Sequence, residues 1–250
     1  MAVLRFFAGP IVEWISNTGL LLVSAILAGA GLLMLSFAGN IVMVGVAATV
    51  FALGVCYFWP TMLGTVAERV PKGGALALAL LGGTGAVVVG VITTPLMGKI
   101  ADQYLHRELV YKSEGVDREK QTASVLGRIE SSYLAWQKSL GDSKQDQLTR
   151  TEIDAAVADV RRVLEEYQRD GKLPELETAN ALRSAIKNGP GDNAEGVAAE
   201  ALNAKQDAKT ILDPAENHGG LMSFRYVAPL SVMLVVVFGV MYVQDRGRRK

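Results

Sequence analysis

Four runs without a charged side chain dominate the hydrophobic pattern of this chain: residues 18–37, 40–67, 73–98 and 226–243. A helix needs roughly 20 residues to cross the hydrocarbon layer of a bilayer, and each run is close to that length or longer. A helix on the surface of a soluble core would also present a polar face, which these runs lack. The pattern therefore predicts four transmembrane helices.

A short charged turn joins the second and third runs. Residues 68–72, ERVPK, contain three charges and a proline, and two glycines follow them. Proline and glycine are typical of tight turns. We therefore predict that residues 40–98 form a membrane hairpin, and that the rest of the chain is organised around it.

Residues 99–222 have a different pattern, in which apolar residues recur every three or four positions. Such spacing lines one face of a helix. It predicts one helix around Leu126–Leu140 and another around Ile153–Tyr167, with further helices near 175–187 and 194–209. These helices would cover their apolar faces by packing against one another.

The distribution of charged residues separates the same two parts of the chain. Residues 100–222 contain 16 Lys and Arg and 22 Asp and Glu, a net charge of −6, whereas the rest of the chain contains 9 and 3, a net charge of +6. We therefore predict an all-α chain: a polytopic membrane helix bundle of about four complete transmembrane helices, with a soluble extracytoplasmic helical insert. The predicted domains are a membrane domain at 1–98, which begins with part of a helix, the insert at 99–222, and a final transmembrane helix with a basic tail at 223–250.

Basic residues near helix ends predict the orientation, because they favour the cytoplasmic side. Four of the last five residues, 246–250, are basic. This places the C-terminus in the cytoplasm, residues 100–222 outside it and the 68–72 turn inside. Lys99 and Arg225 lie on the outer side and run against this assignment. We expect a multi-pass protein of the cell inner (plasma) membrane.

Several classes of protein are excluded by composition. The chain has one cysteine, Cys56, and two histidines, His106 and His218. This predicts no disulfide framework, no metal site and no bound cofactor. No nucleophile and base are paired by the pattern, so we expect no enzyme activity. Because the insert is acidic, we expect no nucleic-acid partner.

Two segments carry a family resemblance. Residues 5–16, RFFAGPIVEWIS, resemble the loop between the eighth and ninth helices of major facilitator superfamily (MFS) transporters. This loop carries a degenerate G-x-L-a-D-r-x-G motif, which Gly9, Ile11, Val12 and Glu13 fit, whereas Trp14 replaces its basic residue and Ser16 its final glycine. Residues 57–78, YFWPTMLGTVAERVPKGGALAL, are similar to helices ten and eleven of a sugar- or nucleoside-permease-like branch of that family.

The resemblance covers about residues 1–98 and 221–245, and it implies the C-terminal portion of a transporter, from about helix eight or nine to helix twelve. The large insert between helices eleven and twelve departs from the family pattern. MFS transporters form their substrate site between two six-helix halves. We therefore expect this chain to be incomplete alone, as a truncated reading frame or as one half that assembles with an N-terminal half-transporter.

One aromatic cluster is the leading candidate for contact with a substrate: Tyr57, Trp59, Pro60 and Thr61. A proline inside a helix frees a carbonyl, which must be satisfied by protein or by a cavity. The aromatic rings are suited to stacking on a sugar or a base. The alternative is packing at a helix kink or an aromatic belt at the membrane interface.

Small residues follow one another at helical spacing in the third run, on the faces 75/79/83 and 82/86/90. Such residues allow close approach of helix backbones in lipid. The stripe serves either a rocking surface in alternating access or static helix packing. A proline near its outer end is expected to break or bend the helix. The residues are Ala75, Ala79, Gly82, Gly83, Gly85, Ala86, Gly90 and Pro95.

Charged residues in the predicted cytoplasmic loops form a third set: Arg5, Glu13, Glu68 and Arg69. They are candidates for ion pairs that hold one state of a transporter. The alternative is a set of solvated loop charges, because exposed pairs contribute little free energy.

The leading hypothesis is the C-terminal part of an MFS-type secondary transporter, a permease or symporter that moves a small polar solute such as a sugar or nucleoside. Its expected partners are the lipid bilayer, the solute and an N-terminal half-transporter. The alternative is a four-span membrane adaptor whose outer helical bundle binds a partner protein, with Tyr133 and Trp136 in a docking surface rather than in the core.

Overall fold

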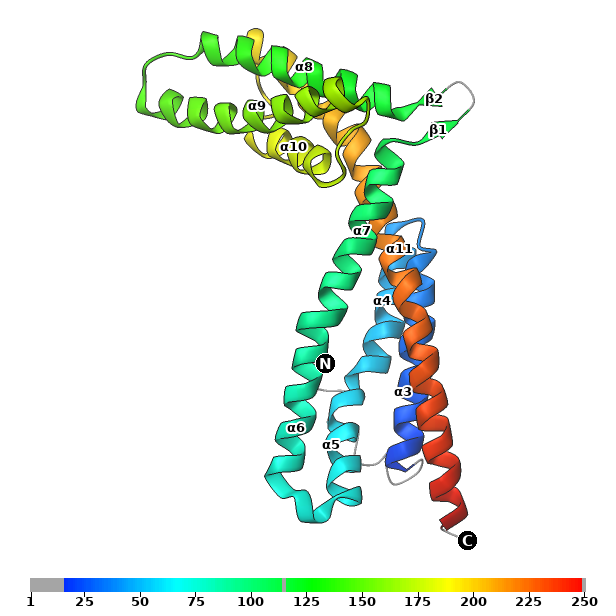
Figure 1. Ribbon diagram of the computed structural model, residues 1–250. Helices are drawn as coiled ribbons and strands as arrows, with labels where there is room; N and C mark the ends of the chain where they lie inside the picture. The colour runs from blue at the N-terminus through cyan, green and yellow to red at the C-terminus, as the bar shows by residue number, and fades with distance from the viewer. Residues whose placement is uncertain (1–15, 114–115, 249–250) are drawn as a thin grey trace. The chain divides into compact units, whose positions relative to one another are not determined.

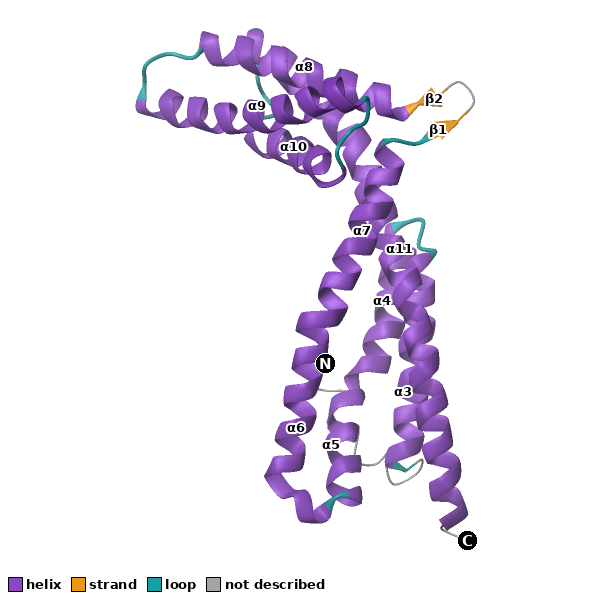
Figure 2. Ribbon diagram, in the orientation of Figure 1, coloured by secondary structure: helices purple, strands orange, loops and turns teal. Residues whose placement is uncertain are grey.

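The computed structural model describes residues 16–113 and 116–248, and nearly all of them are helical (Figure 1 and Figure 2). The contacts divide the chain into two compact units. We call Met1–Ile100 with Leu221–Lys250 the apolar unit, and Ala101–Gly220 the polar unit. The prediction of a largely helical chain is confirmed.

The apolar unit contains α3 (Asn17–Ser36), α4 (Ile41–Cys56), α5 (Phe58–Arg69), a 3₁₀ turn (Pro71–Gly73), α6 (Gly74–Val87) and a π-helical turn (Val88–Thr93). It also holds the first part of α7 (Thr94–Leu109) and the last part of α11 (Val197–Arg248). Four helical stretches are long and apolar enough to cross a membrane, as predicted: Asn17–Ser36, Ile41–Arg69, Pro71–Leu109 and Val197–Gly247.

Glycines bring the helices of the apolar unit into close contact. A Cβ atom on Gly31 of α3 would lie 2.5 Å from the backbone nitrogen of Phe51 in α4. A Cβ atom on Gly54 would meet the backbone of Ala28, and one on Gly29 would meet the side chain of Ser231 in α11. If these helices lie in lipid, as predicted, the hydrophobic effect drives little association between them, and close backbone contact is expected to hold them together.

A small apolar cluster completes this packing. Leu21 and Ala25 of α3 are buried against Phe238 of α11. The Phe58 ring of α5 meets the Phe238 ring edge-on, with 5.6 Å between their centroids. The cluster therefore ties α3, α5 and α11 together.

The run predicted as one span at 40–67 is interrupted. Helix α4 ends at Cys56, Tyr57 forms a turn, and α5 begins at Phe58. The next predicted span, 73–98, is continuous but contains the π-helical turn directly before α7. Both the interruption and the π-helical turn precede a proline, Pro60 or Pro95, which cannot donate a backbone hydrogen bond.

The polar unit is a bundle of α8 (Arg118–Ser139), α9 (Lys144–Asp170) and α10 (Glu175–Asn188) with parts of α7 and α11. Two antiparallel two-residue strands, β1 (Lys112–Ser113) and β2 (Val116–Asp117), precede α8. Helix α9 is capped by Gly171, whose φ of 68° is the left-handed conformation that glycine adopts without strain.

Large apolar side chains fill the interior of the polar unit. Leu126, Ile129, Ile153 and Leu182 are fully buried, as is Tyr133. The Tyr133 hydroxyl donates to the carbonyl of Ala185 at 2.7 Å, and burial raises the pKa of Tyr133 above its ordinary value. An alanine series on α11 completes the core: Ala201, Ala204, Ala208 and Ala215.

Helix α11 differs from its prediction. The helix expected near 194–209 and the span expected at 226–243 belong to one helix, Val197–Arg248. It runs through Pro214 and the glycine pair Gly219–Gly220. A Cβ atom on Gly219 would lie 2.5 Å from the carbonyl oxygen of Ala101 in α7, so this glycine permits close packing of the two helices.

Candidate functional site

The predicted aromatic cluster lies at the interruption between α4 and α5. Tyr57 has φ −92° and ψ −10°, and its N–H donates to the carbonyl of Val55. Pro60 is the third residue of α5. Backbone N–H groups in the first turn of a helix have no partner within it, so proline is tolerated there. The interruption therefore falls three residues before Pro60.

The threonines of α5 satisfy the carbonyls near the interruption. Thr61 donates from its N–H and its hydroxyl to the carbonyl of Tyr57, at 3.2 and 2.6 Å. Thr65 donates its hydroxyl to the carbonyl of Thr61 at 2.8 Å. Both side chains are buried. Their hydroxyls thus serve the backbone of α5, whereas Tyr57 and Pro60 are half-buried.

Trp59 is the most accessible member of the cluster, with 47 % of its surface exposed. Its Cη2 atom lies 3.7 Å from the position of a Cβ atom on Gly82 in α6. Phe58 instead contacts Phe238 of α11. The interruption between α4 and α5 therefore presents one ring to α6 and the next to α11.

The small-residue stripe of α6 has little packed against it. Nothing described lies within 4 Å of a Cβ atom added to Gly83, Gly85 or Gly90. Ala75, Ala79 and Ala86 are exposed. Among the predicted glycines, only Gly82 has a described neighbour at this distance, the ring of Trp59.

The close helix contacts lie at glycines outside the predicted stripe: Gly29, Gly31 and Gly54. The signal available in the sequence was the small-residue spacing of AGAG at residues 28–31. Composition alone does not indicate that residues 28–31, and not the glycine-rich stretch of α6, make the close helix contacts.

Pro95 does not end its helix. The turn before it widens to a π-helix over Val88–Thr93, and α7 continues from Thr94. The hydroxyl of Thr94 donates to the carbonyl of Val89 at 2.9 Å, five residues back. A widened turn relieves the clash between a proline ring and the preceding turn.

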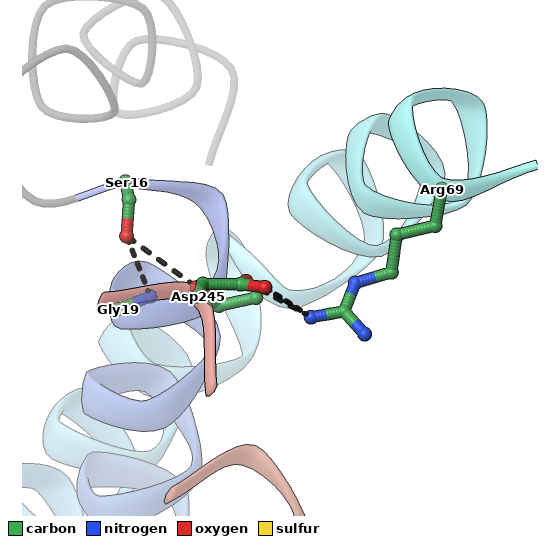
Figure 3. Close-up of polar contacts among 5 residues, drawn as sticks. Ser16, Gly19, Arg69 and Asp245 are labelled. Atoms are coloured by element: carbon green, nitrogen blue, oxygen red, sulfur yellow. Dashed lines mark hydrogen bonds and ion pairs between the residues drawn. The ribbon is translucent and has the colours of Figure 1, made fainter. Parts of the chain in front are cut away.

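The charged residues after α5 have partners that the sequence did not predict. Glu68 accepts a hydrogen bond from the Asn17 side chain at 2.5 Å. Arg69 donates through Nη2 to both carboxylate oxygens of Asp245 in α11, at 2.8 and 2.9 Å (Figure 3). Both side chains of the ion pair are about one-third exposed. The predicted residues Arg5 and Glu13 lie outside the described residues.

Asp245 was not among the predicted site residues, although its position in the sequence is distinctive. It is the only acidic residue after the last apolar run, within VQDRGRRK. The ion pair joins the end of α5 to the end of α11, so the 68–72 turn and the last turns of α11 lie at the same end of the apolar unit.

Ser16 adopts an unusual backbone conformation at the start of α3. Its φ of 73° and ψ of 157° fall in a region used almost only by glycine. The Ser16 hydroxyl accepts from the N–H of Gly19 at 3.3 Å and caps the helix (Figure 3). Ser16 stands where the motif quoted above has its final glycine.

Among the described residues of the polar unit, two shallow grooves of about 250 and 380 Å³ lie between α8 and α11. Both are lined by Arg128 and Asp207, which form an ion pair at 2.7 Å. Across residues 16–113 and 116–248, no three His, Cys, Asp or Glu side chains gather as metal ligands.

No protein family, curated protein or solved structure matches this chain.

Proposed function

We propose that the chain is a multi-pass protein of the cell inner membrane, with its C-terminus in the cytoplasm and residues 100–222 outside it. The four long apolar helices support the membrane location. The Arg69–Asp245 ion pair supports placing the 68–72 turn and the end of α11 on one side of the membrane, and the basic residues near both segments favour the cytoplasm as that side.

Within the membrane, we propose that the chain is the C-terminal part of an MFS-type secondary transporter for a small polar solute, such as a sugar or nucleoside. The observation that carries this proposal is the interruption of the Ile41–Arg69 span at Tyr57, with Trp59 exposed beside it. Transporters form midplane solute sites at interrupted helices. An exposed indole ring is suited to stacking on a sugar or base.

The backbone of Ser16 gives this proposal a second, weaker support. A motif that ends in glycine places a residue there that tolerates positive φ. Ser16 has a glycine-type conformation at the matching position. The substitution leaves the motif degenerate, so this observation supports the resemblance without identifying the solute.

Four spanning helices do not enclose a central cavity, so the proposed transporter requires an N-terminal half. No residue of α6 or of the π-helical turn, 74–93, is buried. This leaves surface for further helices. Co-expression with an N-terminal half-transporter is therefore part of the test.

The test is uptake into liposomes of a panel of labelled sugars and nucleosides, by the chain alone and with the N-terminal half. Trp59→Ala should lower uptake by about fivefold, because a stacked aromatic contact contributes roughly 1 kcal/mol. Tyr226→Ala, which removes another exposed aromatic ring, should leave uptake unchanged. Equal uptake by both variants would contradict the assignment of Trp59.

The adaptor is a second candidate because the polar unit has its own core and a charged surface. This reading requires no solute pathway. It predicts no uptake under any gradient, together with stable binding of a defined partner through residues 118–210. Uptake of any solute by the assembled halves would contradict it.

A further inference from the structure

We infer that α6 binds an anionic phospholipid, with the lipid phosphate at Lys72 and an acyl chain along the groove that α6 forms above it. This inference rests on the proposed membrane location and does not depend on transport.

The groove lies on one face of α6. It has a volume of about 470 Å³ and is lined almost wholly by apolar atoms. Leu76, Leu80 and Val87 form its walls, and the small residues Ala79 and Gly83 leave the space between them. These positions recur every three or four residues and therefore share one face.

The length of the groove fits one leaflet of a bilayer. Residues 76 to 88 span about 18 Å at the rise of an α-helix. The hydrocarbon core of a bilayer is about 30 Å thick, so one leaflet accounts for about 15 Å. An acyl chain lying along the groove would therefore be covered for most of its length.

A cation precedes the groove in the chain. Lys72 is exposed in the 3₁₀ turn Pro71–Gly73, four residues before Leu76. With the residues that the structure describes, it forms no ion pair, whereas the neighbouring Arg69 is paired with Asp245. Charge complementarity at this end of the groove thus favours an anionic headgroup.

The groove alternates large and small side chains. Leu76 and Val87 stand on the same face, and 69 % and 61 % of their surfaces are exposed. A flexible acyl chain can follow this alternation of large and small residues.

The test is lipid retention by the detergent-purified full chain, measured by native mass spectrometry with phosphatidylglycerol and phosphatidylcholine in competition. We expect phosphatidylglycerol to be retained preferentially. Lys72→Gln should lower its retention about fivefold, the effect of one cation near an anionic surface. Gly83→Leu should lower it similarly by filling the groove, and Gly83 has open space for the larger side chain.

Two control variants match these changes. Lys99→Gln removes a cation beyond the other end of the 73–98 run, and Gly85→Leu enlarges a glycine that also has open space but does not line the groove. Both should retain phosphatidylglycerol as the unchanged protein does. Equal retention of the two lipids, or equal effects of Lys72→Gln and Lys99→Gln, would overturn the inference.

Two further outcomes separate this inference from the proposed function. Release of the chain from membranes by alkaline carbonate, without detergent, would overturn the membrane location and the lipid site together. Disulfide crosslinking between two copies through Leu80→Cys in native membranes would overturn only the lipid site, because a second copy would then cover the groove.

Discussion

The two units of this protein bury opposite kinds of residue. In the polar unit, large side chains such as Leu126 and Ile153 are buried, and the charged residues lie mostly outside. In the apolar unit, the buried positions are largely glycine, alanine, serine and threonine, including Ser24 and Thr61, whereas Leu80 and other large side chains are exposed. Water drives large apolar groups inward, and lipid does not. The difference between the units is therefore the one expected if, as proposed, the apolar unit lies in lipid and the polar unit in water.

The largest effect is expected when the same substitution, leucine to alanine, is made in both units. Leu126→Ala in α8 should lower the free energy of unfolding by about 2–5 kcal/mol, because it leaves a cavity in a packed core. Leu80→Ala in α6 should change it by less than about 0.5 kcal/mol, since that side chain packs on no core. Thermal unfolding of the full chain in detergent measures both, and equal losses would refute the comparison.

A smaller effect tests the glycine contacts within the apolar unit. Gly31→Ala should destabilise the chain by about 1–3 kcal/mol, because the added methyl group meets the backbone of Phe51. Gly45→Ala, in the neighbouring α4, has open space around it and should be neutral or slightly stabilising. The unfolding temperature of each variant in the same detergent provides the readout. If Gly31→Ala matched Gly45→Ala, α3 and α4 would not be in close contact.

A glycine at the strained start of α3 should raise the free energy of unfolding, whereas Leu126→Ala and Gly31→Ala should lower it. Ser16→Gly relieves the positive φ, which is unfavourable by about 1–3 kcal/mol in a non-glycine residue, but it also removes the helix cap. We expect a net stabilisation of about 1 kcal/mol in the same unfolding assay. Ser16→Ala keeps the strain and loses the cap, so it should destabilise the chain. A lower stability for Ser16→Gly than for Ser16→Ala would count against the backbone conformation.

The smallest effect concerns the Arg69–Asp245 ion pair. A double-mutant cycle with Arg69→Gln and Asp245→Asn should give a coupling free energy of about 0.2–1 kcal/mol, because both side chains are partly exposed. The coupling should fall as salt is added. A coupling of zero at low salt would mean that the two helix ends are not joined in this way.

Much of the fold follows from residue patterns that depend on sequence alone. The uncharged run 18–37 corresponds to α3, and the apolar spacing of 175–187 corresponds to α10. Hydrophobic periodicity and length determine such elements locally. The exact site of the interruption at Tyr57 was not predicted, because a proline is compatible with a helix if it lies in the first turn.

Contacts between helices were the part that sequence reasoning could not supply. The partners of Arg69 and Glu68, Asp245 and Asn17, are distant in sequence, and nothing in their spacing relates them. The choice between the glycines of α3 and those of α6 likewise depends on which helices are neighbours. A single sequence specifies faces of helices, but it does not specify which faces meet.

The π-helical turn before Pro95 has a consequence for the surfaces of the third span. One extra residue in a turn advances the following helix by about 100° relative to an uninterrupted α-helix. Beyond that turn, the carbonyl of Met97 accepts a hydrogen bond from the hydroxyl of Ser223 in α11 at 3.1 Å. Deleting Val89 would restore regular winding and rotate this carbonyl away from its donor. A one-residue insertion therefore allows one continuous helix to keep one face exposed before the turn and to direct a different face toward α11 after it.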